Sequence, residues 1–76
     1  MNKTRRKSLS EIKDKIEDLK IDIELLLDEE QEYLDNIPEN MQSSERYEKA
    51  EEAVAALEDA INSLEEAVDS IDTAIE

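Results

Sequence analysis

Two runs of apolar residues, spaced alternately three and four apart, constrain the fold of this chain more than any other feature. This heptad spacing places one apolar stripe along each of two α-helices and predicts an all-α, coiled-coil-like fold. The first run is Leu9, Ile12, Ile16, Leu19, Ile23, Leu26, Tyr33 and Ile37, with Glu30 in the one polar position. The second run is Tyr47, Ala50, Val54, Leu57, Ile61, Leu64, Val68, Ile71 and Ile75.

The first helix is predicted over residues 8–37. Ser8 and Glu11 have the spacing of a capping box, in which a serine side chain and a glutamate side chain each accept from the other's backbone amide. Residues 1–7 carry four cations, which oppose the positive end of a helix dipole. We therefore expect these residues to form a mobile basic arm outside the helix.

A single proline predicts the connection between the two helices. Pro38 disfavours a helical conformation in the residue before it and has no amide to donate, so a turn is expected over residues 38–42. Ser43 or Ser44 is the expected cap of the second helix, over residues 43–75. So short a connection makes the helices antiparallel neighbours, which predicts a two-helix hairpin.

The two apolar stripes also predict a register. Facing layers of an antiparallel pair lie at equal distances along the chain from the turn, and seven apolar pairs satisfy this condition about residue 40. They are Leu9 with Ile71, Ile12 with Val68, Ile16 with Leu64, Leu19 with Ile61, Ile23 with Leu57, Leu26 with Val54 and Tyr33 with Tyr47. Beside this seam, Lys13 and Lys20 are expected to form ion pairs with Glu58, Glu65 and Asp72.

Two further groups of residues leave the oligomeric state open. An alanine column beside the second stripe would let a second hairpin approach and form a four-helix bundle, although alanine is also the best helix former. Ile21 and Leu25 lie opposite the first stripe, either as a partner contact or as ordinary scattered surface residues. The alanine column consists of Ala53, Ala60, Ala67 and Ala74.

Composition excludes the common catalytic and metal-binding arrangements. The chain has no Cys, no His and no Gly, which removes disulfides, zinc sites, di-iron bundles and glycine-containing calcium loops. No nucleophile and base pair is recognisable, so we expect no enzyme activity, no cofactor and no metal. No apolar run approaches the ~20 residues that cross a bilayer, and a cytoplasmic location is expected.

Charge is distributed unevenly along the chain. The net charge of −14 divides into +3 for residues 1–20, −12 for residues 21–59 and −5 for residues 60–76. In a hairpin the first and last segments lie side by side, so the turn end carries nearly all the negative charge. Such a field attracts basic protein surfaces and repels membranes and nucleic acid, and this disfavours direct nucleic-acid binding by the basic arm.

The density of charge is compatible with mimicry of nucleic acid. A helix of about 30 residues spans roughly 45 Å, over which duplex DNA carries about 26 phosphate charges. The net charge of the hairpin is about half of that. The alternative is that acidity only keeps the protein in solution. Candidate partner-binding residues are Asp22, Glu24, Asp28, Glu29, Glu32, Asp35, Glu39, Glu45, Glu48, Glu51 and Glu52, with Ile21 and Leu25 adding apolar contact.

Several segments of the chain resemble those of short uncharacterised proteins. These segments are the basic start (residues 2–7), the central segments 36–40 and 44–46, and the acidic alanine heptads that follow. The proteins that they resemble are acidic helical proteins of bacteriophages and integrated mobile elements of Gram-positive bacteria. The resemblance brings no catalytic residues with it. It implies a phage or mobile-element origin, and small acidic proteins of that source include inhibitors of host defence nucleases.

Two functions follow as expectations from the sequence. The first is a non-catalytic acidic binding module that docks on a basic protein surface, as a nucleic-acid-mimicking inhibitor of a host defence nuclease. The second is a self-assembling structural or scaffold protein built as a helical bundle. Binding that weakens with salt favours the first, and a molar mass above that of one chain favours the second.

Overall fold

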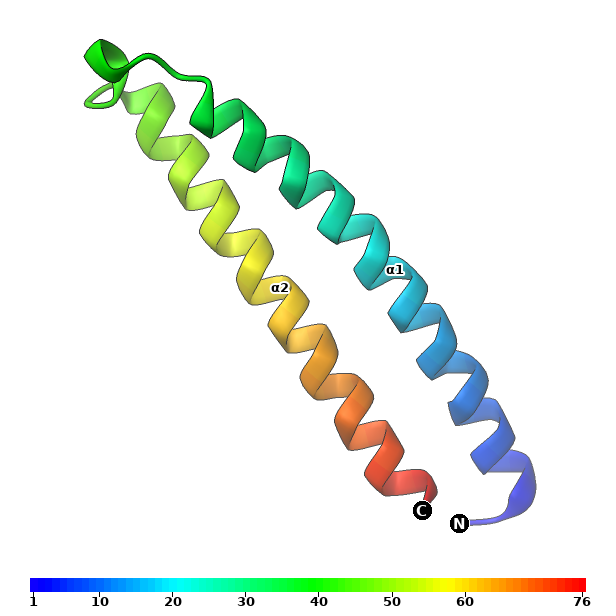
Figure 1. Ribbon diagram of the computed structural model, residues 1–76. Coiled ribbons are helices and arrows are strands. Elements are labelled where there is room, and N and C mark those ends of the chain that lie inside the picture. The colour runs from blue at the N-terminus through cyan, green and yellow to red at the C-terminus, as the bar shows by residue number, and fades with distance from the viewer.

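The protein is an antiparallel helical hairpin. The computed structural model describes all 76 residues, as α1 (Lys3–Asp35), a short 3-10 helix η1 (Glu39–Met41) and α2 (Glu45–Ile75). The two long helices lie side by side along a rod with extents of 59 × 15 × 13 Å. Both termini lie at one end of the rod and the connection lies at the other (Figure 1). The predicted all-α hairpin is therefore confirmed.

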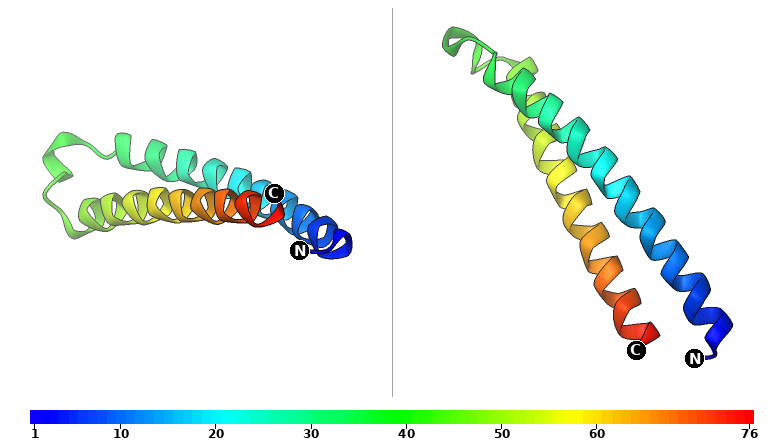
Figure 2. Two further views of the ribbon diagram at one scale, coloured as in Figure 1. Left: turned by 90° about the horizontal axis from the view of Figure 1, so that it is seen from below. Right: turned by 45° about the vertical axis from the view of Figure 1, so that its right-hand side comes forward.

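The turn lies where the proline predicts it. α1 ends at Asp35, and the amide of Asn36 closes its last turn by donating to the Glu32 carbonyl over 3.1 Å. Met41 then donates to the Pro38 carbonyl over 2.8 Å within η1, and the connection bridges the two helix ends as an open loop (Figure 2). The predicted end of the first helix at residue 37 is two residues too late.

Ser44 is the cap of α2. Its hydroxyl accepts a hydrogen bond from the Tyr47 amide over 3.3 Å and donates to the Met41 carbonyl over 2.6 Å. One side chain therefore satisfies an orphan amide of the helix and fastens the helix start to the turn. Of the two serines that the sequence offered, Ser44 caps the helix and Ser43 precedes it.

The predicted start of the first helix is wrong. α1 begins at Lys3, because the Asn2 side chain accepts from the Arg5 amide over 2.8 Å and caps the helix there. Asn is as good a cap as Ser, and no residue between Asn2 and Ser8 breaks a helix. Each of the four cations near the helix N-terminus costs ~0.3–1 kcal/mol, and the helix nevertheless begins at Lys3. Residues 3–7 thus extend α1 and do not form a separate arm.

The apolar stripe of α2 faces α1 as predicted. Ala50, Val54 and Ile61 are buried, with exposed fractions of 3%, 7% and 8%. The other members of the stripe are half-buried: Tyr47, Leu57, Leu64, Val68, Ile71 and Ile75.

The predicted face of α1 is only partly correct. Ile12, Leu19 and Leu26 have exposed fractions of 46%, 59% and 57%, so these residues do not pack between the helices as the predicted register requires. Tyr33 is 38% exposed and has the guanidinium of Arg46 over its ring. The residues that follow each of these four stripe residues are half-buried: Lys13, Lys20, Leu27 and Leu34. α1 is therefore turned about its own axis relative to the prediction, and Leu9, Ile16 and Ile23 are the predicted stripe residues of the helix that remain half-buried.

Two neighbouring apolar rows on α1 explain this difference. Leu27 and Leu34 extend the row that begins at Lys13 and Lys20, so either of two faces of α1 offers apolar surface to α2. The face that is used also brings both lysines to carboxylates of α2, and lysine stems cover apolar surface while the ammonium groups stay in water.

The core of the hairpin is small. Only Ile37, Ala50, Val54 and Ile61 are buried, and no side chain is fully enclosed. The chain exposes 5752 Å², whereas a folded monomer of 8.7 kDa exposes about 4,700 Å². The hairpin therefore leaves about 1,000 Å² more surface in water than a compact domain of its mass.

Candidate functional site

The acidic residues gather at the turn end of the rod. We define the acidic turn end as residues 21–59, which carry a net charge of −12. The chain reversal brings the second half of α1 and the first half of α2 side by side there (Figure 1). Of the eleven predicted partner-binding carboxylates, Glu24 is half-buried and the other ten are exposed: Asp22, Asp28, Glu29, Glu32, Asp35, Glu39, Glu45, Glu48, Glu51 and Glu52.

Both cations of this segment are already engaged. Lys49 pairs with Glu45 one helical turn away, over 3.1 Å. Arg46 donates from Nε to the Tyr33 hydroxyl, and its guanidinium carbon lies 5.2 Å from the centre of the Tyr33 ring. A cation over a tyrosine ring is held by the negative face of the ring. Each of the two cations therefore already has a neighbour within the chain, an acidic one for Lys49 and an aromatic one for Arg46.

Most carboxylates of the acidic turn end have no cationic partner. Glu24 lies 3.9 Å from Lys20, and Asp35 accepts a hydrogen bond from Gln31 over 2.9 Å. With Glu45 paired to Lys49, nine candidate carboxylates remain without an ion pair, and eight of them also accept no side-chain hydrogen bond: Asp22, Asp28, Glu29, Glu32, Glu39, Glu48, Glu51 and Glu52. These side chains are exposed and available to an external cation.

The turn also forms a small pocket that the sequence analysis missed. Its volume is about 130 Å³, close to that of one medium-sized side chain. The apolar wall comes from the connection, and the remaining walls come from the ends of both helices: Ile37, Pro38 and Met41, with Tyr33, Asn36 and Arg46. The pocket exists only because the chain reverses here, so no spacing along the sequence indicates it.

Ile21 and Leu25 lie outside this pocket. Both are exposed on α1, as the sequence predicts for a lone hairpin. They occupy the face of α1 that points away from α2. The structure therefore does not bring them together with the turn pocket, and any apolar contact that they make belongs to a separate surface.

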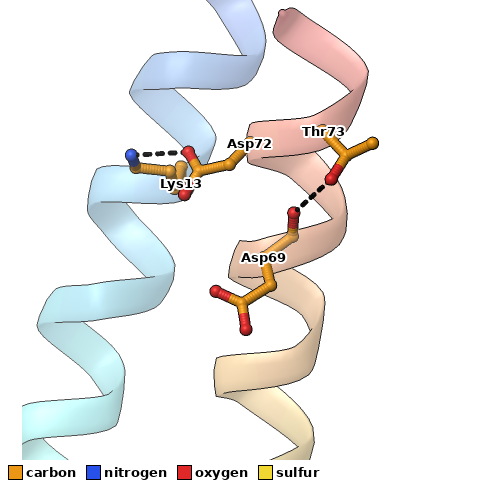
Figure 3. Close-up of polar contacts among 4 residues, drawn as sticks. All are labelled: Lys13, Asp69, Asp72 and Thr73. Carbon is orange, nitrogen blue, oxygen red and sulfur yellow. Dashed lines mark hydrogen bonds and ion pairs between the residues drawn. The ribbon is translucent and has the colours of Figure 1, made fainter.

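Ion pairs join the two helices toward the end of the rod that holds both termini, which we call the open end. Lys13 pairs with Asp72 over 2.8 Å and Lys20 pairs with Glu65 over 3.3 Å, which confirms two of the predicted interhelical contacts, whereas Glu58 has no ion pair. Figure 3 shows the first pair, with the Thr73 hydroxyl donating to the Asp69 carbonyl one turn away. The hydrogen bond to Asp72 raises the pKa of Lys13.

Two geometric features limit what these carboxylates and helices can do. No three acidic side chains converge closely enough to hold a metal ion. Neither α1 nor α2 combines the length and apolar character that a bilayer crossing requires. The arrangement combines an exposed acidic surface and the small turn pocket with paired residues along one edge.

Comparison with protein-family models, with curated proteins and with solved structures gave no match to this chain. The resemblance to proteins of phages and mobile elements stays a prediction.

Proposed function

We propose that this chain is a non-catalytic binding module that docks its acidic turn end on a basic protein surface. One observation supports this function most strongly. The hairpin joins two helix halves into a single surface with a net charge of −12, and both of the cations within that surface are engaged.

Long-range attraction and one apolar contact act together in this mode of binding. The concentrated charge speeds the encounter with a basic partner and orients the turn end toward it. The turn pocket of about 130 Å³ then takes one apolar side chain of the partner, while carboxylates around it contact the partner's cations. A buried apolar anchor within a charged rim is the usual arrangement of a strong contact site.

Nucleic-acid-binding proteins are the partner class that we favour. The acidic turn end presents exposed carboxylates from both α1 and α2, which lie side by side in a rod 59 Å long. A basic cleft that follows a phosphate backbone has the complementary shape and sign of charge. Occupation of that cleft blocks access of nucleic acid, which is how an inhibitor of a defence nuclease acts.

A matched pair of triple variants tests the proposal. The turn-end variant carries Glu39→Gln, Glu48→Gln and Glu52→Gln, and the open-end variant carries Glu66→Gln, Asp69→Asn and Glu76→Gln. Each variant removes three negative charges. All six side chains are exposed and unpaired, so neither variant breaks an ion pair. Wild type and both variants are immobilised, proteins from a Gram-positive bacterium are captured, and the affinity of each captured protein is measured at low and high salt.

The turn-end variant is expected to bind about tenfold more weakly, because three exposed charge contacts of ~0.5 kcal/mol each are lost. The open-end variant keeps wild-type affinity, and nucleic acid competes for the captured partner. Equal weakening by both variants shows only diffuse charge attraction and contradicts the proposed site. Affinity that does not change with salt contradicts the electrostatic mechanism.

A further inference from the structure

One long side of the hairpin is left without a partner. We define the exposed row as Ile12, Leu19, Leu26 and Tyr33, which repeat every seven residues along α1 and are the least covered apolar residues of its predicted stripe. A row of this spacing normally lies against another helix. In this chain α2 lies against the neighbouring face of α1 and leaves Ile12, Leu19 and Leu26 about half exposed, while Arg46 lies over the ring of Tyr33.

The ion pairs establish which side of the hairpin the row occupies. On α1, Lys13 and Lys20 lie on one side of the interhelical contact and the exposed row lies on the other. On α2, their partners Glu65 and Asp72 lie on one side of the buried stripe. Ala60 precedes Glu65, and Ala67 precedes Asp72, by five residues. At the helical repeat of 3.6 residues per turn, this spacing places the alanine column on the opposite side of that stripe. The exposed row and the alanine column therefore share one side of the rod, away from the ion pairs.

We propose that this side binds a second copy of the chain, with α1 antiparallel to α1 of that copy, and so forms a four-helix bundle. The inference does not depend on a partner at the acidic turn end. Its first support is the register of the row. With a two-fold axis between residues 22 and 23, Leu19 faces Leu26 of the second copy and Ile12 faces its Tyr33. The row is thus complementary to itself, as a closed two-fold interface requires.

Charge is the second support, and it selects the antiparallel orientation. A parallel pair sets two segments of net charge −12 side by side. The antiparallel pair instead brings residues 3–7 of one copy, which hold four cations, level with residues 38–42 of the other. Lys15 flanks the row and comes within one residue of the level of Glu29 of the second copy. Asp22 lies beside its own symmetry mate at the axis, which is a like-charge contact of this register.

Surface area is the third support. A stable interface buries about 800 Å² on each partner. The hairpin exposes 5752 Å², about 1,000 Å² more than a compact monomer of its mass, which is enough surface for an interface of that size. The core of one hairpin has only four buried residues, and a dimer enlarges this core.

Molar mass, measured by sedimentation and light scattering from 1 µM to 1 mM, tests the interface. The row variant carries Leu19→Glu and Leu26→Glu, and the control carries Ile21→Glu and Leu25→Glu on another exposed face of α1. All four residues are exposed, so both variants keep their helical circular dichroism. Wild type and control are expected to be dimers, and the row variant is expected to be a monomer with at least a hundredfold weaker association. A monomeric wild type at 1 mM overturns the proposal, as does equal weakening by both variants or open assembly beyond a dimer.

A charge swap tests the register with Lys15 and Glu29, two exposed side chains that do not pack between α1 and α2. Lys15→Glu and Glu29→Lys are each expected to weaken the dimer about fivefold, because each removes two symmetric pairs of ~0.5 kcal/mol. The double variant restores the wild-type dissociation constant, and Asp22→Asn tightens the dimer. A double variant as weak as either single variant overturns the antiparallel register. This test remains decisive if the row variant fails to fold.

Discussion

Truncation of Ile61, compared with truncation of Leu19, distinguishes the observed packing of α1 from the packing that the heptad pattern predicts. The pattern places these two residues in one layer, where each would be equally costly to remove. In the structure Ile61 has an exposed fraction of 8% and Leu19 has one of 59%. The two alanine variants are therefore expected to differ clearly in stability.

The magnitudes follow from the carbons that each substitution removes from contact. Ile61→Ala deletes three carbons at ~0.8 kcal/mol each, or about 2.4 kcal/mol. A solvent-filled groove bounded by Glu24, Leu27 and Glu58 lies beside Ile61, so water reaches the vacated space and little cavity penalty is added. Leu19→Ala deletes the same number of carbons, but more than half of the side chain is already in water, and the loss is about 1 kcal/mol.

Urea unfolding followed by circular dichroism at 222 nm measures both losses. Unfolding is measured at several protein concentrations from about 1 to 100 µM, so that the concentration-dependent contribution of association is separated from the stability of the single hairpin. With a denaturant dependence of about 1 kcal/mol per molar urea, the unfolding midpoint falls by about 2.4 M for Ile61→Ala and by about 1 M for Leu19→Ala. Equal shifts would refute the reasoning, because they would place Leu19 between the helices as the heptad pattern predicts.

Three smaller perturbations test the local contacts. Asp72→Asn should lower the pKa of Lys13 toward 10.5 in an NMR titration, and an unchanged titration contradicts the pair. Because the folded pKa of Lys13 is raised, the stabilisation by this pair is full below pH 10.5 and disappears as pH rises through the folded pKa. Ser44→Ala should cost ~1 kcal/mol and lower the melting temperature by about 4–8 °C, while Ser43→Ala changes neither, and equal effects contradict the cap. Asn2→Ala should reduce the helical Cα chemical shifts of residues 3–7 without changing the melting temperature, and intact shifts contradict that cap.

The sequence predicted the structure correctly where a pattern of residues is compatible with only one arrangement of the helices. α2 has one apolar stripe with alanines and acids around it, so only one face fits against a partner helix. Pro38 likewise allows one place for the chain to reverse. The interhelical pairs of Lys13 and Lys20 were predicted because their α2 partners lie on the same edge of any antiparallel hairpin with this turn.

The same reasoning failed where the sequence allows two solutions. α1 offers two adjacent apolar rows, and the choice between them depends on how Lys13, Lys20 and Leu27 pack against α2, which heptad spacing does not describe. The start of α1 was a choice between Asn2 and Ser8, two residues of similar capping strength. The turn pocket is formed by residues that meet only after the chain reverses.

The rotation of α1 leaves the proposed function intact. Concentration of charge at the turn end depends on the position of the turn and on the antiparallel arrangement, and both of these are as predicted. The rotation instead changes which apolar residues are available for association. It exposes Leu19 and Leu26 and so turns a predicted core row into the proposed interface between two copies.

Chemical cross-linking tests most directly the claim that each chain folds back on itself with this face of α1 against α2. The chain has no cysteine, so Lys13→Cys and Asp72→Cys introduce the only two thiols, at positions whose native side chains lie 2.8 Å apart. A short bismaleimide added at about 1 µM protein should link them within one chain in high yield. The pair Ile12→Cys and Asp72→Cys, with the first thiol on the exposed row, should link poorly. Links that form only between chains, or equally well from both pairs, would contradict the hairpin and its packing.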